Sequence, residues 1–109
     1  MRINIKPLSV NQAWQGRRFK TPKYKAYEAE VLLKLKPMQI GKGKLSLRLI
    51  VAYSNSQSDI DNCLTPFLDI LQKKYLLNDS QIYELNIRKC IVKKGSEFID
   101  FEVKEYAEF

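Results

Sequence analysis

The sequence predicts an α+β fold, in which a small mixed β-sheet packs with two helices in the order β-α-β-α-β-β. Three observations support this fold class. Residues 44–53 alternate between apolar and other residues, as a strand does. Two stretches carry apolar residues at spacings of three and four, which is typical of amphipathic helices. Two further apolar runs follow near the C-terminus, and residues 1–109 are short enough to form one domain around a single core.

The first strand and the first helix are predicted from local signals. Residues 3–5 alternate apolar and polar side chains before Pro7, which indicates a short strand suited to a sheet edge. No clear period follows in residues 8–20. Thr21 and Pro22 are typical of a helix N-cap with proline at the first helical position, and this helix is expected to end just before Pro37.

The second strand and the second helix enclose a polar segment. The alternation over residues 44–53 predicts a strand whose second face is also partly apolar. Residues 54–58 are rich in Ser, Asn and Gln. The helical spacing resumes at about Asp61 and continues to Tyr75. The last turn contains Lys73 and Lys74, and positive charges suit a helix C-terminus.

The last two strands are predicted to form a hairpin. Residues 81–92 and residues 97–104 have strand-like patterns. The Lys-Lys-Gly-Ser sequence at 93–96 separates them by the length of a short hairpin loop. The predicted sheet therefore ends in two strands that pair with each other.

Composition excludes several classes of function. The chain has no histidine, which removes Ser-His and Cys-His catalysis and leaves carboxylates and lysines as candidate catalytic groups. Cys63 and Cys90 lack metal-type spacing, so we expect both to be reduced and packed in a cytoplasmic protein. No apolar run approaches the roughly 20 residues that span a bilayer, and no signal-peptide pattern begins the chain, so no membrane contact is expected.

Charge indicates a polyanionic partner. The net charge is +7, and the first 96 residues carry 18 basic and 7 acidic residues. Nucleic acid is the usual partner of such a surface. Arg17, Arg18 and Lys20 lie among aromatic residues without an acid nearby, so they are suited to phosphates while the aromatics stack on unpaired bases. The alternative is a surface loop whose Trp14 packs into the core.

Three aspartates form the candidate chemical site. Asp59 and Asp61 are one residue apart, so in an extended backbone both carboxylates would point to the same side. Asp79 follows the second predicted helix, where the chain could bring it beside them. Three converging carboxylates require a hard cation such as Mg²⁺ or Mn²⁺. The spacing also fits a helix cap at Asp59 or Asp61 and a turn role for Asp79.

Four segments carry a family resemblance. They are residues 7–11, 59–62, 67–71 and 78–82, together with the basic segment after Trp14. With them, the chain resembles the RusA-type Holliday junction resolvases, which are common in bacteriophages and prophages. The resemblance spans nearly the whole chain, and its acidic motif is fairly specific for the family.

The resemblance implies both an activity and an assembly. It implies that Asp59, Asp61 and Asp79 bind Mg²⁺ or Mn²⁺ for cleavage, and that a homodimer makes paired symmetric nicks in four-way DNA junctions. It also implies a phage or prophage gene expressed in the cytoplasm of a bacterial host. Asn62 is a candidate for orienting a carboxylate or contacting DNA. The basic residues expected to contact DNA phosphates are Arg17, Arg18, Lys20, Lys73, Lys93 and Lys94.

One position departs from the family pattern. Thr65 stands where the family usually has a lysine, in the first turn of the second predicted helix. Such a lysine could stabilise charge on the phosphate or position water. Three explanations stay open: Lys73 or Lys89 substitutes, the metal suffices, or the chain is weakened. A non-catalytic DNA-binding module is therefore the alternative function, and a small RNA-binding protein is a third that leaves the acids unexplained.

Overall fold

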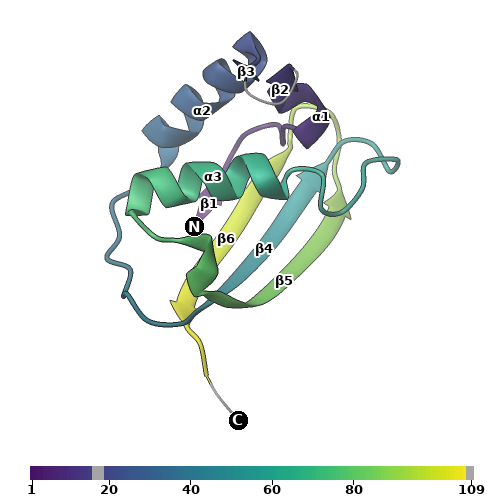
Figure 1. The fold of residues 1–109 in the computed structure, drawn as a ribbon. Helices are drawn as coiled ribbons and strands as arrows, with labels where there is room; N and C mark the ends of the chain where they lie inside the picture. Colours follow the sequence, from purple (N-terminus) through teal and green to yellow (C-terminus); the bar gives the residue numbers. More distant parts are fainter. Residues whose placement is uncertain (16–18, 108–109) are drawn as a thin grey trace.

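A four-stranded mixed sheet forms the base of the fold (Figure 1). The computed structural model describes residues 1–15 and 19–107. The strands of this sheet are β1 (Arg2–Ile3), β4 (Leu45–Tyr53), β5 (Ile82–Ile91) and β6 (Phe98–Glu105). Their order is β1-β6-β4-β5, with β4 and β5 parallel and the other pairs antiparallel. The α+β class is confirmed, and β1 is an edge strand as expected.

The helices lie on one face of this sheet (Figure 1). They are α1 (Val10–Ala13), α2 (Pro22–Lys34) and α3 (Leu64–Tyr75), with a 3₁₀ helix η1 at Asp79–Gln81. Thr21 caps α2 as predicted, since its side chain accepts a hydrogen bond from the backbone N of Tyr24. The predicted helices α2 and α3 are present. The four-residue α1 and the short pair β2 (Trp14–Gln15) and β3 (Phe19–Lys20) fall in the stretch where no period was found.

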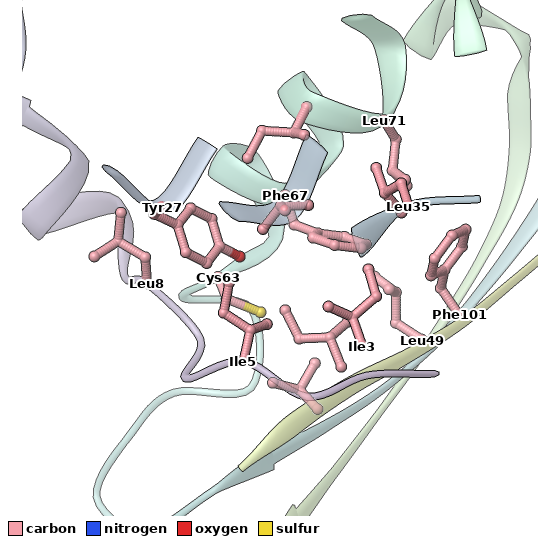
Figure 2. Close-up of a cluster of buried hydrophobic side chains, with 14 of the residues drawn as sticks. Ile3, Ile5, Leu8, Tyr27, Leu35, Leu49, Cys63, Phe67, Leu71 and Phe101 are labelled. Carbon is pink, nitrogen blue, oxygen red and sulfur yellow. The ribbon is translucent and has the colours of Figure 1, made fainter. Parts of the chain in front are cut away.

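The core lies between β4, β6 and the helices (Figure 2). Phe67 of α3 meets Phe101 of β6 edge to face, with ring centroids 5.5 Å apart. Leu49 on β4 is 1% exposed, in line with the alternation that predicted this strand. In the described part of the chain, the buried residues include no charged or strongly polar side chain. The acidic and basic side chains in the described part of the chain therefore all have some exposure to solvent.

The predicted C-terminal hairpin is wrong. β5 and β6 both exist, but β4 lies between them and pairs with each. The turn at 93–96 is present, with Ser96 N donating to Lys93 O at 3.0 Å and Gly95 at a φ of 95° that suits glycine. It carries the chain past the end of β4 to that strand's other edge. Two consecutive strands have the same periodicity whether they pair with each other or flank a third strand.

Candidate functional site

Asp59 and Asp61 lie in the loop between β4 and α3. We call residues 54–62 the acid loop. Its backbone is turned rather than extended, because Asn62 N donates to Asp59 O at 3.2 Å and Leu64 N donates to Asp61 O at 3.0 Å. An extended backbone would point the carboxylates of Asp59 and Asp61 to the same side, but this loop does not have that backbone. Both aspartates are exposed and lie on one short loop.

Neither aspartate caps α3. The helix begins at Leu64 rather than near Asp61, and its N-cap is Cys63, which makes no side-chain capping bond. The structural alternative for this pair, a helix cap, is thus excluded.

Asp79 is likewise free of a capping role. It is the first residue of η1, and the cap is Asn78, whose side chain accepts from Ser80 N at 2.9 Å. Gln81 completes the capping box by accepting from Asn78 N at 2.9 Å. Asp79 contributes its backbone N, which donates to Gln72 Oε1 at 3.0 Å, while its side chain is exposed.

Asp79 lies at the opposite end of β4 from the acid loop. It precedes β5 where Ile82 pairs with Leu45, the first residue of β4. The acid loop follows Tyr53, the last residue of β4, and a nine-residue strand is about 26 Å long. Among the described residues, no three acids or cysteines are grouped so that they could hold a metal ion. The expected approach of Asp79 to the pair does not occur within one chain.

Lys89 holds the acid loop from the neighbouring strand. Its Nζ donates to the backbone O of Ser58 at 2.6 Å and of Ser56 at 3.0 Å. Asp59 follows directly. Lys89 is on β5, opposite Val51 of β4, so its side chain crosses the sheet end to reach the loop. Its ammonium group therefore brings a positive charge next to the aspartate pair.

Tyr53 anchors the same loop from below. Its hydroxyl donates to Asp59 O at 3.2 Å. Burial raises the pKa of the Tyr53 hydroxyl, and nearby Cys63 and Asp61 raise it further. Burial also raises the pKa of the Cys63 thiol, an effect that its hydrogen bond with Tyr53 opposes and the charge of Asp61 reinforces. Both groups stay protonated near neutral pH, so neither competes with the aspartates as an anionic ligand.

The basic residues predicted to contact DNA fall into separate groups. Lys20 and Lys73 both bind Glu28 of α2, each at 3.1 Å, and lie over the helical layer. Lys93 and Lys94 are exposed in the turn after β5. This turn is at the acid-loop end of the sheet, since Val92 N donates to Tyr53 O at 2.8 Å. The predicted contacts Arg17 and Arg18 lie outside the described residues.

A polar cavity of about 260 Å³ borders the acid loop. Its lining includes Lys6, Ser9, Gln12, Asn55, Asn62 and Glu97. Asn62, expected to act near the site, does border this cavity, and Val10 N donates to its backbone O at 2.8 Å. Thr65 is exposed in the first turn of α3. Lys6 was missed because nothing in its local sequence links the first strand to a loop more than 45 positions later.

The structure defines a small α+β protein with an excess of basic residues and a carboxylate-bearing loop held by a lysine. Comparison with protein families gives a match to the model described as endodeoxyribonuclease RusA, over residues 6–100 of the 109. The chain therefore belongs to the RusA family of Holliday junction resolving endodeoxyribonucleases, as the resemblance implied. The matched range includes the acid loop and Asp79.

Among curated proteins, no match was found. In the described part of the chain, no helix combines the length and the apolar character needed to cross a bilayer.

Proposed function

We propose that the protein is a Mg²⁺- or Mn²⁺-dependent endodeoxyribonuclease that resolves four-way DNA junctions by paired symmetric nicks. The observation that carries this proposal is a family match that includes three aspartates whose carboxylates have no capping role in the fold. We place its action in DNA recombination and repair, in the cytoplasm of a bacterial host cell that carries the phage or prophage gene.

The chemistry of the carboxylates fits a hard divalent cation. Mg²⁺ is commonly bound through one or two carboxylates together with substrate phosphates, and Asp59 and Asp61 can supply that pair from one loop. A cation held there would polarise the scissile phosphate and lower the pKa of a bound water. The protein's own part is to hold the loop through Tyr53 and Lys89.

A homodimer follows from the position of Asp79. In one chain Asp79 and the acid loop lie at opposite ends of β4. If all three aspartates act at one phosphate, as the family resemblance implies, Asp79 must come from a second copy. Two such sites, one per protomer, would cut two opposed strands of a junction, and their fixed separation would favour a branched substrate over a linear duplex.

We propose Lys89 as the cation that compensates for Thr65. Lys73, the other candidate, is bound to Glu28 on α2. Lys89 already reaches the residue before Asp59. A charge there can stabilise the phosphate during cleavage. Lys93, Lys94 and Lys6 extend the same positive surface to backbone phosphates beside the loop.

The test is a cleavage assay on a labelled synthetic four-way junction and a matched linear duplex, each with Mg²⁺, with Mn²⁺ and with EDTA. We expect symmetric nicks in the junction alone, and none with EDTA. Cleavage of both substrates at equal rates would exclude junction selectivity, and cleavage in EDTA would exclude the metal requirement.

A weakened or non-catalytic junction-binding module is the second candidate function, and Thr65 is the observation in its favour. The same assay separates the two, because such a module binds the junction in a gel shift without nicking it under any metal. In that case Thr65→Lys is the variant to make, and recovery of nicking would identify Thr65 as the cause.

A further inference from the structure

The polar cavity of about 260 Å³ beside the acid loop is built from three segments that are distant in the sequence. They are residues 6–12, the acid loop, and the turn that precedes β6. Backbone hydrogen bonds hold these segments together, since Val10 N donates to Asn62 O and Val92 N donates to Tyr53 O, each at 2.8 Å. The cavity is therefore a formed part of the fold next to the aspartates.

The lining of this cavity is mostly polar and carries charges of both signs. Lys6 and Glu97 supply one charge of each sign, and Gln12, Asn55 and Asn62 supply side-chain amides. A carboxylate repels phosphate, so the lining does not suit a phosphate group alone. Pockets for drug-sized ligands are mostly apolar and have volumes of about 300–1,000 Å³. This smaller, polar cavity suits one compact group that is rich in hydrogen-bonding atoms.

Glu97 and two of the amides can bind a ligand without breaking bonds of the fold. Glu97 Oε1 accepts from Gly95 N at 2.8 Å, and a carboxylate has about four lone-pair sites, so acceptor capacity remains. A hydrogen bond from its own backbone N–H lowers the pKa of Glu97 against the effect of burial, so the carboxylate only accepts at neutral pH. The hydrogen bonds that fix Gln12 and Asn62 in the fold run through their backbones.

We propose that this cavity binds one unpaired nucleobase beside the cleaved phosphate, and that Glu97 accepts a hydrogen bond from the exocyclic amino group of that base. Adenine, cytosine and guanine carry such a group, and thymine does not. Carboxylates accept from the amino group of cytosine, and Asn and Gln side chains pair with the edge of adenine. Enzymes that bind unpaired bases read them in pockets through contacts of this kind.

The position of the cavity determines which nucleotide reaches it. Ser58 and Asn62 line it, and they flank Asp59 and Asp61 in the chain. A phosphate held at those aspartates brings a neighbouring base to the cavity, so the inference rests on the proposed function. The stack of bases is interrupted at a branch point, and a base that is poorly stacked costs less to move out. The base at this position would then set how fast each junction is cut.

Fluorescence of 2-aminopurine tests the cavity without any cleavage. This base carries an exocyclic amino group and brightens when it leaves the stack. Placed in turn at the positions beside the branch point of a junction, it should brighten at one of them when wild type binds in EDTA. Gln12→Ala should reduce that rise at least threefold. Glu97→Gln should do the same, because Gly95 N already occupies the one acceptor oxygen of the new amide.

Glu102→Gln is the matched control for this measurement. It makes the same change at a carboxylate that binds Arg48 and does not line the cavity, so it should leave the rise as in wild type. Circular dichroism checks that each variant is folded. A rise that both cavity variants leave unchanged would come from distortion of the junction, and it would overturn the proposal. The absence of a rise at every position would also overturn it.

Cleavage of four junctions that differ only in the base at the responding position tests the role of Glu97. We expect wild type to cut the thymine junction roughly fivefold or more slowly than the best of the other three, as one edge contact allows. Glu97→Gln should narrow this difference, since its amide can donate to thymine O4. Equal wild-type rates on all four would overturn base reading while leaving the nuclease proposal intact. Brightening that depends on the cavity variants, without cleavage under any metal, would support the base site and contradict the nuclease proposal.

Discussion

Asp61 contributes to the fold through its backbone. Its carbonyl accepts a hydrogen bond from Leu64 N at 3.0 Å and closes the turn into α3. Its carboxylate is exposed and caps nothing. A substitution that keeps the shape of this side chain should therefore separate chemistry from stability at this position.

Asp61→Asn should abolish cleavage while leaving the fold intact. We expect a loss of roughly a hundredfold or more in the nicking rate, the size seen when one electrostatic catalytic group is removed. Junction binding in a gel shift should persist or tighten, because a negative charge facing phosphate is lost. The circular dichroism spectrum and melting temperature should match wild type. Loss of both binding and fold would make Asp61 a structural residue.

Lys89→Met should slow cleavage by roughly tenfold to a hundredfold, as expected when a group that orients a catalytic side chain is lost. The bonds to Ser56 and Ser58 disappear, so the acid loop loosens and the local positive charge is gone. Lys34→Met is the matched control. It removes a lysine bound to Glu30 instead and should leave the nicking rate nearly unchanged. Equal effects of the two changes would contradict the assignment of Lys89.

The two long helices are joined by a charged clamp. Glu28 on α2 accepts bonds from Lys20 and from Lys73 of α3, each at 3.1 Å. Burial by itself would raise the pKa of Glu28, but the hydrogen bonds from Lys73 and Lys20 outweigh it and lower the pKa below the ordinary 4.5. The folded state therefore holds the proton less tightly than the unfolded chain.

Glu28→Gln should reveal this linkage in stability measured against pH. A depressed carboxylate pKa stabilises the fold fully above about 4.5, and the effect is lost as pH falls through the folded-state pKa. We expect the variant to be less stable by about 1 kcal/mol at pH 7, and the difference to shrink below pH 4.5. Urea titrations at pH 7 and pH 3.5 measure it. Glu30→Gln, which removes an exposed pair with Lys34, is the control.

Elements with strong periodicity were predictable, and their pairing was not. The alternation over 44–53 and the spacing of α3 reflect burial of one face, which the chain encodes locally. Which strand neighbours β4 depends on contacts between distant segments, so the predicted hairpin was wrong. The four-residue α1 is too short to show a period.

In the candidate site, too, the features encoded locally were predictable and those that depend on distant segments were not. The acid loop was found from the spacing of Asp59 and Asp61 and from the family resemblance. The spatial separation of Asp79 could not be read from the sequence, because it depends on β5 running parallel to β4. Lys89 was named only as one of two substitutes for the missing lysine. Its bonds to the loop depend on the register of two strands.

At the scale of the whole molecule, the aspartates predicted to act together lie at two opposite ends of one chain's sheet. The acid loop and the turn at 93–96 lie at one end of the sheet, and Asp79 lies at the other. Asp69 of α3 lies near Asp79, and burial raises its pKa, with Lys20 opposing that shift and Asp79 and Glu28 adding to it.

Mixing two inactive variants should restore activity if sites are shared between copies. In a dimer of Asp61→Asn with Asp79→Asn, one site carries both changes and the other carries neither. Random exchange between equal amounts should therefore recover about a quarter of wild-type nicking, as single nicks. The control mixes Asp59→Asn with Asp61→Asn, which leaves every loop defective and should stay inactive. Absence of recovery despite demonstrated subunit exchange would show that each chain builds its site alone, and the dimer would then serve only to space two independent cuts.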